Sequence, residues 1–181
     1  MPRLFTGFEI PQDIRNALAL KQGGLADVRW IEPSDFHLTL RFIGDVDRRM
    51  ASDIVEVLSN DLWPAPVIRI GELKSFGGKK PTSIFASIEP DDTLSRVAQK
   101  QENLMQGLGL PPDSRRFTPH VTIARCRNLS PVALAQYLSH SGFTSANLEF
   151  NPSRFVLYSA RDSRGGGPYR VEKAWNFEHH Q

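Results

Sequence analysis

Two short segments repeat the same order of side chains that could do acid–base chemistry. The first reads FHLTLRF and the second, 83 residues later, reads PHVTIAR. Alternate residues of an extended strand point to one face, so His37 shares a face with Thr39, and His120 shares a face with Thr122. The apolar residues between them point into a core. Each segment therefore predicts an imidazole beside a hydroxyl group on a rigid strand, and two such strands facing each other would frame a small cleft.

A pair of histidines suits proton transfer at a phosphorus atom without a metal. Near neutral pH only histidine populates both protonation states without a large pKa shift. One neutral imidazole would remove the proton from the attacking oxygen, while a charged imidazole would protonate the leaving oxygen. The threonine hydroxyls would donate hydrogen bonds to the non-bridging phosphoryl oxygens. The pattern predicts His37 and His120 as catalytic residues, with Thr39 and Thr122 as phosphate-binding residues.

The motifs also admit interpretations other than catalysis. A single histidine on a strand is more often structural than catalytic. A metal site needs three or four His, Cys or carboxylate ligands, whereas each motif is followed by an arginine, Arg41 or Arg125, whose charge repels a metal and attracts a phosphate. We expect no metal and no cofactor. The chain lacks a G-x-S-x-G elbow, and its GGKKP segment lacks the spacing of a Walker loop. Repetition of the motif in a repeated context favours catalysis.

The composition is that of an ordinary soluble protein. The chain has 181 residues, of which 40% are hydrophobic and 23% are charged, within the usual range for one domain. There is no apolar run of about 18 residues, and the N-terminus lacks the apolar centre of a signal peptide. The single cysteine, Cys126, excludes an intramolecular disulfide and fits a reducing compartment. We expect a cytoplasmic monomer with no membrane association.

The elements that must position the motifs recur in two blocks. Each block reads as a strand ended by proline, an amphipathic helix, a loop, the His-Thr strand, a second helix and a glycine-containing hairpin. The blocks cover approximately residues 3–80 and 82–177. We predict a single α+β domain over residues 1–181, bilobal with pseudo-two-fold symmetry. Two mostly antiparallel sheets would face each other across a central cleft, with helices on the outside.

These segments resemble the RNA 2′,3′-cyclic phosphodiesterases, historically called 2′-5′ RNA ligases, of the two-histidine phosphoesterase superfamily. The likeness runs nearly from end to end and is carried by RLFTGFEIP, VRWIEPSDFHLTLRFIGDV, RRFTPHVTIAR and FVLYSARDSRGGGPYRV. It implies metal-independent hydrolysis of a 2′,3′-cyclic phosphate, on an RNA 3′ end or a cyclic nucleotide, to a 2′-phosphate. The sequence leaves open 2′-5′ RNA ligase activity, a non-catalytic RNA-end binding module, and the identity of the physiological substrate.

The resemblance also implies roles for single residues. The catalytic set carries over onto the two His-Thr pairs, and Arg125 resembles a phosphate ligand. Phe42 and Tyr158 are weaker candidates for the nucleotide pocket, and a plain core role is equally open for Phe42. The family suggests His120 as the base and His37 as the acid in hydrolysis, although the residues themselves do not decide which is which.

Arginines gather in the second half of the chain, although the formal net charge is only +2. A charge this small does not by itself indicate nucleic-acid binding. The arginines near the second motif and in the closing segment are Arg115, Arg116, Arg125, Arg127, Arg161, Arg164 and Arg170. If several line the mouth of the cleft, an RNA strand would bind through its backbone more tightly than a mononucleotide does. The alternative is that they are scattered over solvent faces and the substrate is a small cyclic nucleotide.

Overall fold

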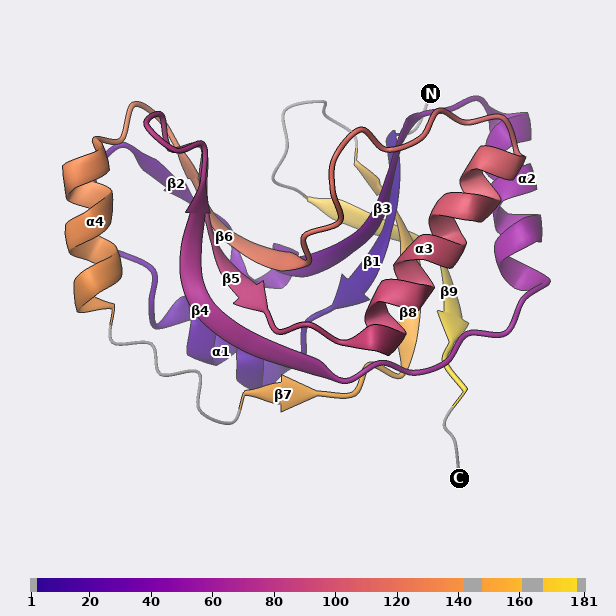
Figure 1. Ribbon diagram of the computed structural model, residues 1–181, viewed down its shortest axis with the longest axis horizontal. Coiled ribbons are helices and arrows are strands. Elements are labelled where there is room, and N and C mark those ends of the chain that lie inside the picture. Colours follow the sequence, from indigo (N-terminus) through magenta and orange to yellow (C-terminus); the bar gives the residue numbers. More distant parts are fainter. Residues whose placement is uncertain (1–2, 142–147, 161–167, 179–181) are drawn as a thin grey trace.

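The computed structural model describes residues 3–141, 148–160 and 168–178, and within these ranges it contains four α-helices and nine strands (Figure 1). The helices are α1 (Gln12–Ala19), α2 (Arg48–Ser59), α3 (Asp92–Gly107) and α4 (Pro131–His140), with a 3-10 turn η1 (Pro33–Asp35). The strands are β1 (Arg3–Glu9), β2 (Val28–Trp30), β3 (His37–Asp45), β4 (Ile68–Phe76), β5 (Ser83–Ile88), β6 (His120–Cys126), β7 (Glu149–Phe150), β8 (Arg154–Ala160) and β9 (Tyr169–Asn176). No described helix is long and apolar enough to cross a lipid bilayer.

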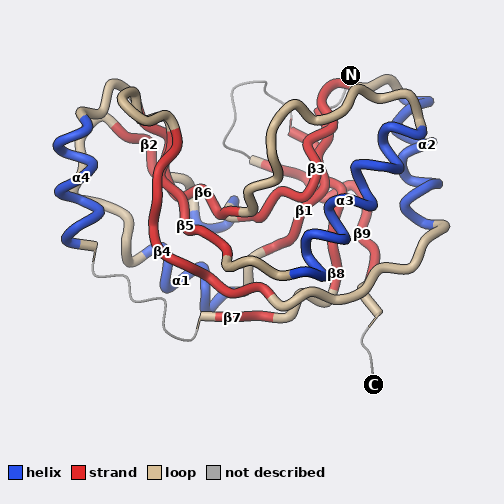
Figure 2. Tube along the Cα trace, viewed as in Figure 1, coloured by secondary structure: helices blue, strands red, loops and turns tan. Residues whose placement is uncertain are grey.

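The strands form one curved sheet in the order β7-β4-β5-β6-β3-β1-β8-β9, with β2 paired to β6. Pairing between these strands is antiparallel throughout, and the helices flank the strand layer (Figure 2). The expected α+β class is confirmed. The two predicted sheets are, however, joined edge to edge, because β3 and β6 pair at Leu38 and Val121, both fully buried. The repeat over residues 3–80 and 82–177 stays a prediction.

Helix starts follow the local sequence. Asp47, Asp91 and Ser130 each accept a hydrogen bond from the backbone N–H three residues later, which satisfies an N–H group that the first helical turn leaves without a partner. The apolar faces that follow, with Ile54 on α2 and Leu94 on α3, are buried against the sheet. The core therefore lies between the helices and one face of the sheet, and the opposite face is left for the motif histidines.

A β-bulge in β6 determines which side chains join that opposite face. Ile123 has no partner on β5; before it Thr122 lies opposite Phe85, and beyond it Arg125 lies opposite Ser83. Phe85 and Ser83 are two residues apart on a regular strand, so they share a face, and the residues opposite them share it as well. Arg125 therefore projects from the same face as Thr122. In a regular strand, three residues of separation would have put it on the opposite face.

The same irregularity recurs in β3. Leu40 has no partner on β1; before it Thr39 lies opposite Gly7, and beyond it Phe42 lies opposite Phe5. Phe42 therefore shares the face of Thr39, as Arg125 shares the face of Thr122 in β6. The aromatic side chain of Phe42 and the cationic side chain of Arg125 thus occupy equivalent positions on β3 and β6.

Arg41 lies behind the sheet, which corrects the sequence-based interpretation that it adds positive charge beside the motifs. The β3 bulge turns it to the buried face, where it forms an ion pair with Glu102 of α3 and donates a hydrogen bond to the Pro111 carbonyl at 2.7 Å. Glu102 also accepts from the backbone N–H of Asp113 at 3.0 Å. Arg41 therefore ties β3 to the loop that leads into β6.

Gly7 has no room for a side chain, because the bulge brings its backbone against β3. A Cβ atom there would lie 2.4 Å from the Leu38 carbonyl oxygen. Gly7→Ala should therefore lower the free energy of unfolding by about 1–3 kcal/mol or more, the usual cost of overpacking a rigid site. Urea unfolding measures the change, with Gly107→Ala as the control, since a methyl group there would meet no atom within 4 Å beyond its chain neighbours and the backbone of its own helix. Equal stability of the two variants would contradict this packing.

Candidate active site

Both motif histidines are held by the same kind of hydrogen bond. The Nδ1 atom of His37 lies 2.9 Å from the carbonyl oxygen of Asp35, and that of His120 lies 2.6 Å from the carbonyl oxygen of Thr118. A carbonyl oxygen only accepts, so in each ring Nδ1–H donates. In the neutral ring Nε2 is then the free acceptor, which is the protonation state that a general base needs.

The antiparallel seam brings the four motif side chains together on one face. Strands β3 and β6 pair antiparallel at Leu38 and Val121. The residues on either side of this pair oppose each other, so His37 lies across from Thr122 and Thr39 lies across from His120. Desolvation and, to a smaller extent, the positive charge of Arg125 lower the pKa of both histidines, so Arg125 lies close enough to act on both rings. The predicted catalytic and phosphate-binding residues thus gather at one place.

Aromatic rings from the neighbouring strands enclose His37. Its ring centroid lies 5.0 Å from that of Phe5 on β1 and 4.8 Å from that of Tyr169 on β9. Tyr158 on β8, one of the weaker candidates from sequence, lies 5.8 Å away and stacks on Phe5 at 4.9 Å. Edge and tilted ring contacts of this kind fix the orientation of an imidazole.

His120 has an equivalent aromatic support. Its ring lies 4.9 Å from Phe76 on β4 and 5.1 Å from Phe85 on β5, and these two phenylalanines stack on each other at 4.1 Å. Phe5, Phe76 and Phe85 were not predicted from the sequence. A signal for two of them was present, because Phe5 and Phe85 are each the third residue of the repeated opening strands RLF and SIF.

Burial keeps both imidazoles neutral. Desolvation, helped by the charges of His120 and Arg125 and opposed by the hydrogen bond to the Asp35 carbonyl, lowers the pKa of His37 to about 4. Desolvation is also the largest cause of the lowered pKa of His120, to which Arg125 and Arg115 add. An anion bound between the two rings would stabilise their charged forms and raise both pKa values.

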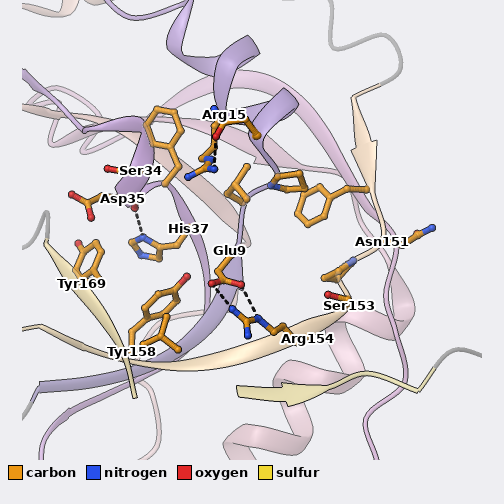
Figure 3. Close-up of a pocket in the computed structure, with 17 residues that line it drawn as sticks. Glu9, Arg15, Ser34, Asp35, His37, Asn151, Ser153, Arg154, Tyr158 and Tyr169 are labelled. Carbon is orange, nitrogen blue, oxygen red and sulfur yellow. Dashed lines mark hydrogen bonds and ion pairs between the residues drawn. The ribbon is translucent and has the colours of Figure 1, made fainter. Parts of the chain in front are cut away.

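A pocket of about 450 Å³ opens beside His37 (Figure 3). It is lined by β1, η1, the start of α1, and strands β8 and β9. Within it Glu9 and Arg154 form an ion pair with two hydrogen bonds of 2.9 Å each, and Tyr158 and Tyr169 lie next to the imidazole. The residues of β6 do not line this pocket. It therefore extends from the centre toward the β1–β8–β9 side only.

The remaining predicted residues are spread around the centre. Phe42 is 40% exposed, and the guanidinium of Arg3 lies 5.2 Å from its ring centroid, so Phe42 has no plain core role. Arg170 is exposed on β9, whereas Arg161 and Arg164 lie outside the described residues. No group of three His, Cys, Asp or Glu side chains placed to hold a metal ion occurs in the parts of the chain that the structure describes.

Comparison with known proteins places these features in a family. The family model described as the 2′-5′ RNA ligase superfamily matches residues 12–164. An RNA 2′,3′-cyclic phosphodiesterase of Bacillus subtilis is 26% identical over 165 residues, which are 87% of this chain and 87% of the relative. One of Aeropyrum pernix is 31% identical over 120 residues, 64% of this chain and 67% of the relative.

Solved structures show the same fold. The crystal structure of Escherichia coli LigT complexed with 3′-AMP superposes with a TM-score of 0.79 at 20% identity, covering 99% of this chain and 100% of that one. At this identity the likeness establishes the fold and nothing further.

The lowered pKa of His37 should make the protein less stable as pH falls. The unfolded state binds a proton below pH 6.5 and the folded state only near pH 4, so stability contributed by neutral His37 is complete above pH 6.5 and is lost as pH falls toward 4. Between pH 7 and 5 this residue should account for about 2 kcal/mol of lost stability. Urea unfolding at pH 7 and at pH 5 measures this loss. The free energy of unfolding of His37→Gln should fall between the two pH values by about 2 kcal/mol less than that of the wild type. His140→Gln, at the exposed end of α4, is the control; if both variants keep the wild-type dependence, His37 is not desolvated.

Proposed function

The chain belongs to the 2′-5′ RNA ligase superfamily, and we propose that it hydrolyses 2′,3′-cyclic phosphates at RNA 3′ ends to 2′-phosphates. One observation carries the proposal: two imidazoles in the same tautomer, each beside a threonine, share one face of the sheet with Arg125. The curated relatives described above, which are named RNA 2′,3′-cyclic phosphodiesterases, support the same reaction.

In the proposed reaction water attacks the phosphorus of the cyclic phosphate. A bond forms between the water oxygen and phosphorus, and the bond between phosphorus and O3′ breaks. A neutral imidazole accepts the water proton at Nε2, and the other imidazole, protonated at Nε2, donates its proton to O3′. The products are a 2′-phosphate and a 3′-hydroxyl. The two rings have exchanged protonation states, and solvent restores them before the next turnover.

Binding of the anionic substrate supplies the charged imidazole. Because desolvation and Arg125 favour the neutral form of both rings, a phosphate oxygen near Nε2 would stabilise the proton there and draw one in from solvent. His37 is the more deeply buried ring, which favours His37 as the neutral base and His120 as the acid. The family resemblance implies the reverse order, so the two assignments make opposite predictions.

The remaining residues hold the phosphate and the nucleoside. The hydroxyls of Thr39 and Thr122 would donate hydrogen bonds to the non-bridging oxygens, and Arg125 would offset the charge that develops on them. Since all three project from strands, they need little reorganisation as charge shifts in the transition state. Tyr158 and Phe42 are the candidates for stacking on a base.

We also infer that the protein acts as a cytoplasmic monomer without a metal or cofactor. Its single cysteine, Cys126, supports a reducing compartment. The arginine that follows the second motif favours an anionic ligand over a metal ion at this place.

Product analysis tests the reaction directly. A short RNA ending in a 2′,3′-cyclic phosphate, incubated with the protein in excess EDTA, should yield only the 2′-phosphate. A 3′-phosphate would mean that O2′ leaves instead, and joining to an RNA with a 5′-hydroxyl would establish ligation. Tight binding of the RNA end without turnover would establish a binding module. Activity that disappears in EDTA and returns with one divalent ion would refute the metal-independent mechanism.

Single substitutions test the roles. His37→Ala and His120→Ala should each lower kcat by about 10²–10⁴-fold, the usual contribution of one proton transfer. Thr39→Ala and Thr122→Ala should lose less, since each removes one hydrogen bond to a charged group, worth about 1.5–3 kcal/mol. His140→Ala, at the exposed end of α4, should match the wild type.

A substrate with a good leaving group then separates the acid from the base. A phosphodiester that releases p-nitrophenolate needs no general acid, so the variant without the acid should regain activity on it and the variant without the base should not. We expect the recovery in His120→Ala. Recovery in His37→Ala would reverse the two roles, and recovery in neither would argue against a division of labour between the rings.

A further inference from the structure

The register of four neighbouring strands gathers cations on the His120 side of the histidine-bearing face. Arg29 on β2 lies opposite Arg125 on β6, and Lys74 on β4 lies opposite Phe85 on β5. Opposed residues share a face, and Phe85 shares the face of Thr122 and Arg125. Lys74, Arg125 and Arg29 therefore project from one side of the sheet, across three strand spacings or about 15 Å.

The turn between β4 and β5 extends this surface with two lysines. Gly77, with a φ of 101°, and Gly78, with a φ of 54°, form the turn, and Lys79 and Lys80 follow in exposed positions. The end of β6 lies beside this turn, since the N–H of Cys126 donates to the Thr82 carbonyl at 2.9 Å.

The basic strip is defined as Lys74, Lys79, Lys80, Arg29 and Arg125. Within the described residues, no carboxylate forms an ion pair with Lys74, Lys79, Lys80 or Arg125. Lys74 and Arg125 lie at exposed positions of the sheet and Lys79 and Lys80 in the adjoining turn, and such a row matches the repeating charge of a nucleic-acid backbone.

The opposite side, beside His37, has a different character. Both histidines have aromatic neighbours, but on this side the rings border a pocket, and of the two arginines that line it Arg154 forms an ion pair with Glu9. Aromatic rings beside a pocket suit a nucleoside better than a row of phosphates. The two sides of the catalytic centre therefore differ in the part of an RNA end that each would accept.

We propose that the RNA strand leaves the catalytic centre over the basic strip, with its phosphates passing Arg125 and Arg29 toward the β4–β5 turn. This path rests on the proposed function, since it takes the cyclic phosphate to lie between the two histidines. In an RNA that ends in a cyclic phosphate, the 2′ and 3′ oxygens of the last ribose belong to the ring, so the rest of the strand is attached only through the 5′ oxygen. A single path over the protein surface therefore accommodates the strand. The substrate class is then an oligonucleotide several nucleotides long, because a mononucleotide has no phosphate that reaches the strip.

Binding measurements test the path without relying on turnover. The probe is a fluorescently labelled RNA pentamer ending in a 2′-phosphate, followed by anisotropy at several salt concentrations, with the matching nucleoside 2′-phosphate measured by competition. The test variants are Lys79→Ala combined with Lys80→Ala, and Lys74→Ala, all at exposed positions. The control combines Arg48→Ala with Arg49→Ala, which removes two exposed charges from α2, at the opposite end of the molecule from the turn (Figure 1).

The strip predicts that the double lysine variant binds the pentamer about fivefold or more weakly and binds the nucleoside 2′-phosphate as the wild type does. The slope of log Kd against log salt should fall by about 0.7 for each phosphate that the variant no longer neutralises. Equal weakening by the α2 control, or no weakening in the lysine variants, would overturn the path. If the pentamer binds in this pattern but no cyclic phosphate is hydrolysed, the proposed reaction fails while the RNA track stands.

Discussion

The candidate site depends on one backbone irregularity that is used twice. In β3 and in β6 the residue three positions after the motif histidine, Leu40 or Ile123, has no partner on the neighbouring strand. A bulge of this kind locally disrupts the hydrogen-bonded ladder, but it re-aims every side chain that follows. As a result the fifth residue after each histidine, Phe42 or Arg125, joins the face of the imidazole and hydroxyl. The residue before it turns to the core, where Ala124 packs and Arg41 is compensated by Glu102.

Electrostatics favour an anion at the assembled site. Two imidazoles and a guanidinium share a small, partly desolvated space, and each cation disfavours protonation of the rings. The arrangement is therefore incomplete without a negative charge. A phosphate between the rings would offset the repulsion and raise their pKa values. It would also accept the hydrogen bonds of the threonines, so binding and activation of the acid become the same event. The hydrogen bonds from Nδ1–H to the Asp35 and Thr118 carbonyls leave Nε2 as the free nitrogen of each neutral ring.

Much of this arrangement could be predicted from the sequence. Period-two alternation correctly paired each histidine with its threonine, because these residues precede the bulges. Beyond the bulges the prediction was only half right: Arg41 and Arg125 were both expected beside the site, but Arg41 lies on the buried face. A bulge is defined by the register of the partner strand, which the sequence of one strand does not contain. The joining of the two sheets at Leu38 and Val121 is likewise a long-range contact, as is the ion pair between Glu9 and Arg154. The rings of Phe5 and Phe85 were not predicted, although both occupy the third position of the repeated opening strands.

The central claim is that both imidazoles act on one phosphorus. The most direct measurement is nitrogen-15 NMR of the imidazole rings at neutral pH, titrated with adenosine 2′-phosphate, with signals assigned through His37→Gln and His120→Gln. The account predicts that the Nε2 signals of both histidines change over one and the same binding curve, with one ring moving toward its protonated value, the other changing at a neutral Nε2, and Nδ1 remaining protonated in both. A shift confined to one ring, or separate curves for the two rings, would contradict a shared phosphate.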